Sequence, residues 1–271
     1  MRQDGVRAAD PEVLSTAAAG AVLETRGLTR RFGGLAAVSG VDLSVAPGEV
    51  RSIIGPNGAG KTTLFNVVTG ALAPTAGRVF FEGRDVTGWR PADIFRAGIV
   101  RSFQVSHVFP KLTVRENIAL LVHGRVRSSG SPFGRARIAP REIDARVHRA
   151  LERLGIADRA AERAGTLSHG DRRLVEIAMA IAAEPRLLML DEPTAGMSPE
   201  ETRATAALLR GLAPALTLVI VEHDMSVVMA ISDRISVLHR GEILAEGPPA
   251  EIRSNRAVQE VYLGVAVPAG A

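Results

Sequence analysis

Apolar and polar residues alternate over residues 41–45, and the turn residues 47–48 connect this segment to a short, mostly aliphatic run at 50–54. Alternation is typical of an antiparallel strand with one buried face, whereas a short aliphatic run is typical of a buried central strand. A pattern of the same kind recurs at residues 78–81. The N-terminal part of the chain is therefore predicted to contain antiparallel β-structure that leads into a buried strand.

Further along the chain, short aliphatic runs alternate with helical patterns. Buried strands that alternate with helices favour an α/β fold with a mostly parallel core sheet, to which the N-terminal side adds an antiparallel β portion. Between about residues 106 and 165 the aliphatic runs stop, and apolar residues recur at helical spacing over 143–154, which predicts a helical insertion. The three later runs are residues 187–190, 216–221 and 235–238.

A glycine-rich turn follows the 50–54 run: Gly55-Pro56-Asn57-Gly58-Ala59-Gly60-Lys61-Thr62-Thr63. Glycines at this spacing let successive backbone N–H groups point at phosphates, while the Lys61 charge meets the β- and γ-phosphates and the Thr62 hydroxyl meets Mg²⁺. The N-terminal end of a helix expected at 61–69 faces the same anion. An ordinary strand–turn–helix is the alternative, but the motif requires both flanking elements and both are predicted.

Carboxylates and a histidine follow two of the predicted strands. Asp191 and Glu192 come directly after 187–190, at the carboxyl edge where parallel sheets collect ligands. Neighbouring side chains on an extended chain point in different directions, so Asp191 is expected to face the water shell of Mg²⁺ and Glu192 the attacking water. His223 follows 216–221 and is expected to sense the γ-phosphate, with a structural hydrogen bond as the alternative.

Two further segments carry candidate chemistry. Gln104 follows the run at 99–103, where its amide can reach Mg²⁺ or water; by itself it would be a surface glutamine. Ser168, the Gly170 amide and the start of a helix expected at 172–183 form a second anion-binding corner, or else a plain helix cap. Two such devices are redundant for one nucleotide, which favours a site shared between two subunits.

Composition excludes several classes of protein. The chain has 271 residues and no cysteine, so it has no disulfide, Cys-ligated zinc or self-held iron–sulfur cluster. No window reaches the ~18 uninterrupted apolar residues of a membrane span, so a membrane role must come through a partner. The net charge of +4 comes from basic residues interleaved with acids, and no nucleic acid is expected as a partner. The arginines at 125–153 form a solvated face or a contact surface for another protein.

Together these residues resemble the ATP-binding cassette family over about residues 22–264. The resemblance implies a P-loop NTPase fold in which two chains enclose two ATP molecules, each bound by Walker A (55–62) of one chain and by Ser168 and Gly170 of the other. It implies catalytic roles for Glu192, His223, Gln104 and Lys61, and magnesium contacts from Thr62, Gln104 and Asp191. The nucleotide contacts that it implies are Phe32, Gly55, Pro56, Asn57, Gly58, Ala59, Gly60, Lys61, Thr62, Thr63, Ser168, His169, Gly170 and Asp171.

Within that family the chain is similar to the ATPase of bacterial importers for branched-chain or other hydrophobic amino acids, whose relatives handle urea and amides. This implies a second ATPase subunit of the same or a homologous chain, two transmembrane permease subunits, a periplasmic solute-binding protein acting indirectly, and a peripheral place on the cytoplasmic face of the inner membrane. The segments that carry the likeness are residues 31–34, 101–104, 195–199, 221–225 and 261–264.

Two other cassette classes remain as alternatives. A lipopolysaccharide-export ATPase also ends in a Tyr-Leu-Gly-like tail, but the segment 101–104 favours the importer. A non-transport cassette that acts on ribosomes or DNA would fit the arginine content, yet such proteins usually carry two cassettes or a long insertion, and this chain has one Walker A.

The signature segment departs from the family pattern. His169 replaces the usual first glycine and Asp171 the usual glutamine, while Ser198 stands where many cassettes have aspartate. The functions of Ser168 and Gly170 are expected to survive these changes, whereas the coupling between subunits is left open to alteration by them. The domain organisation expected is a mobile tail at 1–21, an ATPase domain at 22–264 with a helical subdomain at about 105–182, and a C-terminal tail at 265–271.

Overall fold

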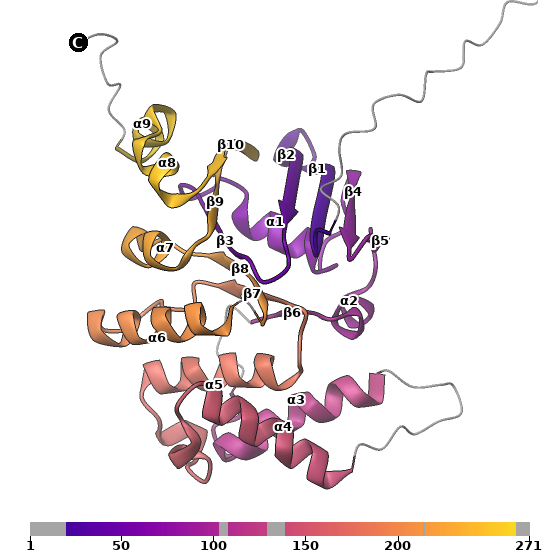
Figure 1. The fold of residues 1–271 in the computed structure, drawn as a ribbon. Helices are drawn as coiled ribbons and strands as arrows, with labels where there is room; N and C mark the ends of the chain where they lie inside the picture. The colour runs from indigo at the N-terminus through magenta and orange to yellow at the C-terminus, as the bar shows by residue number, and fades with distance from the viewer. Residues whose placement is uncertain (1–19, 103–107, 129–138, 214, 264–271) are drawn as a thin grey trace, which may run out of the picture.

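The computed structural model describes residues 20–102, 108–128, 139–213 and 215–263, with only the backbone for 125–128 and 263. The N-terminal tail expected at 1–21 falls almost wholly outside this part, and Gln104 and the tail at 265–271 fall wholly outside it. Within it the chain forms two sheets with helices packed around them (Figure 1). The expected α/β fold, with its antiparallel N-terminal portion and mostly parallel core sheet, is confirmed.

The N-terminal sheet is antiparallel and has the strand order β2-β1-β4-β5. The strand expected over 41–45 is the second half of β2, which pairs with a first strand that the sequence pattern did not indicate. Register shifts around Gly27 interrupt the alternation of that first strand and explain why it was missed. The four strands are β1 (Leu23–Phe32), β2 (Leu35–Val45), β4 (Ala76–Phe81) and β5 (Arg84–Asp85).

The core sheet has the order β10-β9-β3-β8-β7-β6, and all pairings except that of β10 are parallel. β10 is an antiparallel edge strand that the sequence pattern did not predict, because only its three middle residues are apolar and these are half-buried, so they form no long aliphatic run. The strands are β3 (Val50–Ile54), β6 (Ile99–Arg101), β7 (Leu187–Asp191), β8 (Thr217–Val221), β9 (Arg234–His239) and β10 (Glu242–Gly247).

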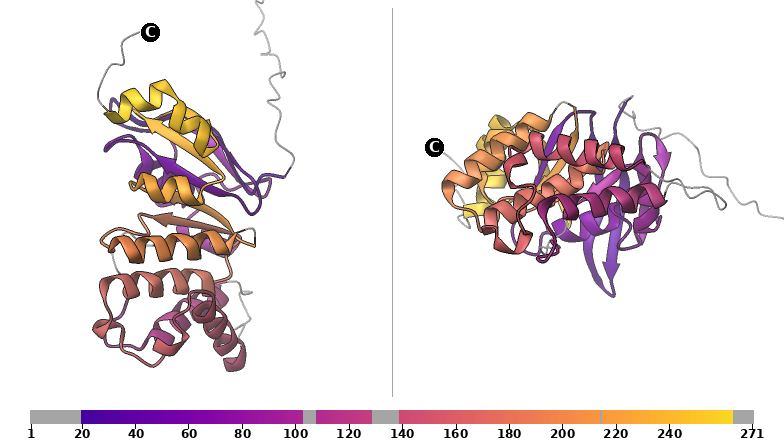
Figure 2. Two further views of the ribbon diagram at one scale, coloured as in Figure 1. Left: turned by 60° about the vertical axis from the view of Figure 1, so that its left-hand side comes forward. Right: turned by 90° about the horizontal axis from the view of Figure 1, so that it is seen from below.

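The helices lie on both sides of the core sheet. Three of them, α3 (Val114–Ser128), α4 (Pro140–Arg153) and α5 (His169–Ala182), pack together at one end of the molecule (Figure 2). α5 begins at His169, three residues before the expected start, because Ser168 caps it. The others are α1 (Lys61–Val68), α2 (Pro91–Ala97), α6 (Pro199–Leu212), α7 (Met225–Ile231), α8 (Pro249–Ser254) and α9 (Arg256–Leu263).

Each central strand contributes to two hydrophobic cores. In β7, Leu187 and Met189 pack on the side of α1 and the antiparallel sheet, whereas Leu188 and Leu190 pack on the side of α5 and α6. Successive side chains of a strand point to opposite faces, so a strand buried on both faces is aliphatic throughout. This double burial fixes the carboxyl end of β7, where Asp191 stands, between two packed layers.

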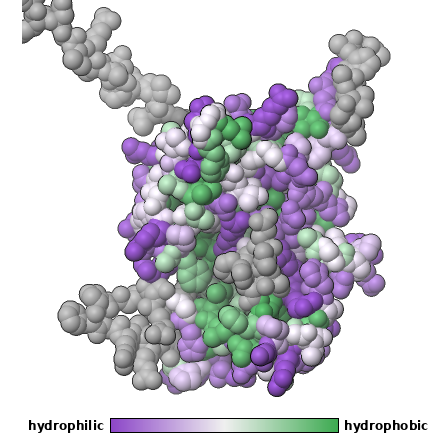
Figure 3. Space-filling model, turned by 180° about the vertical axis from the view of Figure 1, so that it is seen from behind, coloured by the Kyte–Doolittle hydropathy of each residue, from purple (hydrophilic) through white to green (hydrophobic). Residues whose placement is uncertain are grey.

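On the face that is turned away in Figure 1, apolar side chains gather over the lower part (Figure 3). Phe109 and Leu120, at the helical end of the molecule, are 54% and 44% exposed. None of the described helices is long and apolar enough to cross a membrane.

Candidate active site

The glycine-rich turn, here called the phosphate loop (residues 55–63), joins β3 to α1 at the carboxyl edge of the core sheet. Two of its glycines lie against backbone: a Cβ on Gly55 would stand 2.2 Å from the Leu238 carbonyl oxygen, and one on Gly60 2.2 Å from that of Ala37. No larger residue fits at either position. The loop borders a groove of about 220 Å³ that residues 57–63, Ala37, Glu192, Val221 and His223 line.

Lys61 points back into the phosphate loop. Its side chain is buried, and Nζ donates hydrogen bonds to the carbonyl oxygens of Gly55 (2.6 Å) and Pro56 (3.0 Å). Burial lowers the pKa of Lys61, while the charges of Glu192 and Asp191 act in the opposite direction. An anion in the groove would offset the cost of burying this charge, so the lysine is suited to a phosphate.

Asp191 is 1% exposed, and one of its oxygens is left without a partner. Oδ2 accepts from Arg101 Nη2 at 2.8 Å, but Oδ1 has no hydrogen-bond partner among the described residues. An unpaired buried carboxylate oxygen is costly and suits a hard cation or its water. Thr62 lines the groove, and Asp191 directly precedes Glu192, which also lines it. These oxygen donors fit Mg²⁺, and the third expected donor, Gln104, is not among the described residues.

Glu192 and His223 meet at the mouth of the groove. The His223 Nε2 lies 2.9 Å from Glu192 Oε1, and both side chains are partly exposed. Glu192 has φ 49°, a left-handed conformation that a non-glycine residue adopts only when its surroundings hold it there. Its backbone N–H donates to the Val221 carbonyl oxygen at 2.8 Å, which joins the end of β7 to the end of β8. A carboxylate and an imidazole in contact beside a phosphate loop can polarise a water molecule and accept its proton.

A buried carboxylate that the sequence reasoning gave no role supports this pair. Glu222 accepts hydrogen bonds from the backbone N–H (3.1 Å) and hydroxyl (2.5 Å) of Thr194 and from the backbone N–H of His223 (2.9 Å). It therefore connects the segment after Glu192 to the residue that contacts Glu192. Arg101 was missed in the same way. For both Glu222 and Arg101, the only signal in the sequence was a charged residue within or directly after an aliphatic strand.

The signature corner (residues 167–171) lies apart from the groove, since none of its residues lines it. The Ser168 hydroxyl caps α5 by accepting from the Asp171 N–H at 3.1 Å, and it donates to Asp171 Oδ2 at 2.7 Å. Asp171 is also paired with Arg159. The corner is a helix cap and, at the same time, an exposed helix N-terminus.

Phe32 also lies outside the lining of the groove. It ends β1, is 45% exposed, and carries the Arg30 guanidinium over its ring at 4.7 Å from the ring centre. One face of the ring is therefore occupied by a cation within the chain.

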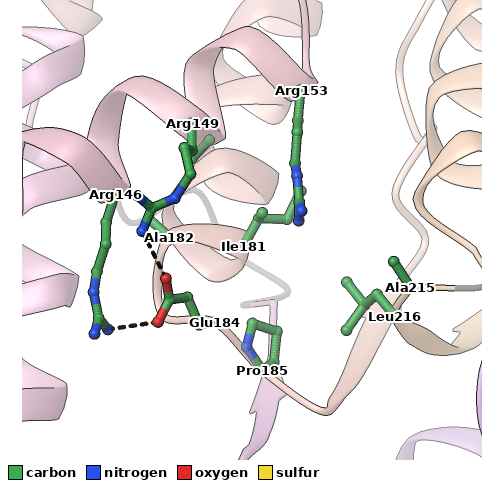
Figure 4. A pocket seen from close by; sticks show the side chains of 10 residues that line it. Arg146, Arg149, Arg153, Ile181, Ala182, Glu184, Pro185, Ala215 and Leu216 are labelled. Atoms are coloured by element: carbon green, nitrogen blue, oxygen red, sulfur yellow. Dashed lines mark hydrogen bonds and ion pairs between the residues drawn. The ribbon is translucent and has the colours of Figure 1, made fainter.

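A second hollow, of about 200 Å³, lies between α4, the end of α5 and the start of β8 (Figure 4). Arg146 and Arg149 of α4 both pair with Glu184, at 3.0 and 2.9 Å. None of the motif residues lines this hollow, and two of its arginines are neutralised by an acid of the same chain. The described part of the 125–153 arginine cluster thus includes a self-paired helical face.

Two family models match the sequence. Residues 38–195 match the model described as ABC transporter, and residues 242–268 match the one described as branched-chain amino acid ATP-binding cassette transporter. Among curated proteins, the high-affinity branched-chain amino acid transport ATP-binding protein BraF of Pseudomonas aeruginosa is 42% identical over 251 residues, which cover 90% of this chain and 98% of that protein.

Solved structures show the same fold. The ADP conformation of MJ1267, an ATP-binding cassette of an ABC transporter, is similar with a TM-score of 0.79 and 34% identity, covering 90% of this chain and 99% of that one. A dimeric post-hydrolysis state of the cassette MJ0796 bound to ADP and Pi is similar with a TM-score of 0.71 and 26% identity over 84% of this chain and 98% of that one. The chain belongs to the ABC transporter family and is an ATP-binding cassette ATPase.

Proposed function

We propose that this chain is the ATP-hydrolysing subunit of a bacterial ABC importer for branched-chain or other hydrophobic amino acids, or for related amides or urea. The observation that carries the proposal is the match of residues 242–268 to a model specific to branched-chain amino acid cassettes, outside the general ATPase region. The identity to BraF over nearly its whole length supports the same solute class. The solute itself is bound by other subunits.

In the proposed mechanism, Lys61 and the phosphate-loop amides hold the phosphates, with the neighbouring residues 55–63 shaping the loop. Glu192 accepts the proton of the attacking water, and His223 holds Glu192 and steadies the γ-phosphate. Thr62, Asp191 and Gln104 would hold Mg²⁺, which neutralises developing phosphate charge when it is bound. Phe32 would contact the adenine with the face of its ring that Arg30 does not cover.

The signature corner supports the proposal of a composite site. Ser168, His169, Gly170 and Asp171 lie away from the groove of their own chain, so a second copy or a homologous chain has to bring its own corner to the bound nucleotide. MJ0796, whose structure is dimeric with ADP and Pi bound, gives a precedent for such an assembly. We propose that residues 22–264 form the ATPase domain, with the helical subdomain at 105–182 directed at two permease subunits on the cytoplasmic face of the inner membrane.

The test is reconstitution of the chain with its co-purified permease pair and periplasmic binding protein in lipid vesicles. Leucine, isoleucine and valine are each expected to stimulate ATP hydrolysis and to accumulate in the vesicles. Glu192→Gln in the same complex is expected to bind ATP, to form closed dimers, and to hydrolyse about 10²- to 10⁴-fold more slowly, because the proton acceptor is lost. Stimulation by urea or a short amide alone would contradict the amino acid assignment, and salt-sensitive RNA binding without permease partners would contradict transport.

A further inference from the structure

The first turns of α5 bind the segment that carries Glu192. Arg173 Nη2 donates to the carbonyl oxygens of Asp191 (2.6 Å) and Glu192 (2.9 Å), and Nε donates to that of Pro193 (3.4 Å). The guanidinium is mostly buried and is oriented by Glu176, whose carboxylate accepts from Nη1 at 2.6 Å. A planar fork of five donors is the one side chain that can serve several converging carbonyls at once.

His169 continues this contact one helical turn earlier. Its Nε2 lies 3.2 Å from the Ala195 carbonyl oxygen, a contact that requires a proton on Nε2 because the carbonyl only accepts. Gly196 lies directly against the ring: its φ is +77°, and a Cβ there would stand 2.9 Å from Nε2. The usual signature glycine at position 169 would leave this contact unmade.

The two side chains lie on one face of α5, since residues four apart on a helix are stacked. Together they hold the carbonyls of residues 191, 192, 193 and 195, and the held stretch contains the left-handed backbone of Glu192. Such a strained residue persists only where its surroundings fix it. Here the fixing groups come from the helix that begins with the signature corner.

We propose that His169 and Arg173, the α5 clamp, are positioning residues that make the signature corner and the Glu192 segment of one chain move as a single unit. This rests on the proposed composite site. There the corner serves the nucleotide of the partner and Glu192 serves the nucleotide of its own chain. The clamp therefore transmits the state of one ATP site to the other through α5.

The experiment uses the full-length chain and measures ATP hydrolysis, its Hill coefficient and ADP affinity in five single variants and one double variant. Arg173→Gln is expected to lower kcat about tenfold or more, with ADP affinity within about twofold of wild type, because Glu192 loses its backbone support while the phosphate loop is untouched. Arg173→Lys is expected to rescue little, since an ammonium cannot span three carbonyls. Arg172→Gln removes the same charge one residue away, where the partly buried side chain makes no hydrogen bond or ion pair with the described residues, and is expected to leave kcat within about twofold of wild type.

His169→Ala separates coupling from folding, because the side chain is exposed and its loss opens no cavity. The Hill coefficient for ATP is expected to fall from about 2 toward 1 while ADP affinity stays unchanged. Gly196→Ala should lower kcat both by straining the backbone at φ +77° and by displacing the imidazole. Its effect should shrink in the His169→Ala background, where the strain remains but no ring is left to displace. Additive effects of the two substitutions, or an unchanged Hill coefficient in His169→Ala, would overturn the clamp.

The outcomes separate the two proposals. A folded wild-type chain that binds ADP but never hydrolyses ATP, alone or with its permease, would contradict the proposed function. If the wild-type chain hydrolyses ATP, and the Arg173→Gln variant folds, binds ADP and has the wild-type kcat, the clamp alone is overturned. If Arg173→Gln does not fold, the His169→Ala and Gly196→Ala pair decides.

Discussion

The phosphate loop and the signature corner are both anion-seeking helix starts, yet the chain builds them in opposite ways. The phosphate loop is enclosed: Lys61 is buried, two glycines touch backbone of other elements, and Glu192 and His223 close the groove. The signature corner is exposed and its polar groups are satisfied internally, because the Ser168 hydroxyl both accepts from and donates to Asp171. The phosphate loop, which is the enclosed half of the proposed site, is preorganised for a ligand. The signature corner, which is the exposed half, must give up an internal hydrogen bond before it can bind a ligand.

The phosphate loop therefore accounts for ligand affinity in the proposed site, and the signature corner for its control. A preorganised cradle gives affinity because little has to be reordered on binding. A corner that must release the Ser168–Asp171 hydrogen bond contributes only when a partner's nucleotide arrives, which suits a step that is taken once per cycle. Asp171 in place of glutamine adds a negative charge near the expected γ-phosphate, and Arg159 offsets that charge.

The first prediction disrupts the enclosed half and has the strongest consequence. Lys61→Ala removes the buried cation, and ADP affinity of the single chain is expected to fall about 100-fold or more, measured by titration calorimetry. Ser168→Ala is the matched change in the exposed half and is expected to leave ADP affinity unchanged while lowering steady-state hydrolysis. Weaker ADP binding by monomeric Ser168→Ala would contradict the division between the two halves.

A second prediction concerns the buried ion pair beneath the phosphate loop. Arg101→Gln leaves Asp191 buried with neither oxygen paired to a cation, which is expected to lower the free energy of unfolding by about 3 kcal/mol. Because Asp191 then attracts a cation more strongly, Mg²⁺ should raise the midpoint of urea unfolding more in the variant than in wild type. Arg26→Gln breaks an exposed pair with Glu24 and is the control, with no change expected. An identical Mg²⁺ response in Arg101→Gln and wild type would argue against Asp191 as a magnesium contact.

The enclosed half could be predicted from the sequence to a greater extent than the exposed one. Residues 55–63 are contiguous, and Asp191, Glu192 and His223 stand at or just after the end of an aliphatic strand, so local pattern and the carboxyl-edge rule suffice to bring them together. Arg101 and Asp191 are 90 residues apart in the sequence, and nothing in either segment indicates the pair. Arg173 resembles any helical arginine until the position of the β7 end is known. The role of Phe32 stays a prediction, since its ring lies outside the groove lining and carries Arg30.

A third prediction tests what supports the exposed half. Ser198 and Glu201 form a capping box at the start of α6. A Cβ on Gly170 would stand 2.6 Å from Glu201 Oε1, so Gly170 of the signature corner packs against the capping box. Ser198→Ala is expected to lower the free energy of unfolding by about 1 kcal/mol. It should lower hydrolysis and leave ADP affinity unchanged, measured by thermal unfolding and calorimetry. Ser254→Ala, at the end of α8, is the control; reduced ADP affinity in Ser198→Ala would show that the two halves are not separately supported.

The smallest effect concerns Tyr262 of α9, which touches the enclosed half from the C-terminal side. Tyr262 is 39% exposed, and burial of the rest of its side chain raises the pKa of Tyr262 to about 12, although a hydrogen bond with the Gly55 backbone acts to lower it. Because the folded-state pKa lies above the unfolded value of about 10, the contribution of the phenol to stability is complete below pH ~10 and is lost as pH rises toward 12.

Since Tyr262 is the one tyrosine of the chain, phenolate absorbance reports on it alone. The folded chain, with circular dichroism recorded in parallel, is expected to reach half-titration near pH 12, and the urea-unfolded chain near pH 10. Tyr262→Phe removes the signal and the contact with Gly55, so it should weaken ADP binding slightly and leave the signature corner unaffected. Half-titration of the folded chain near the unfolded value would show that the Tyr262 hydroxyl is not shielded from water and that α9 does not contact the phosphate loop.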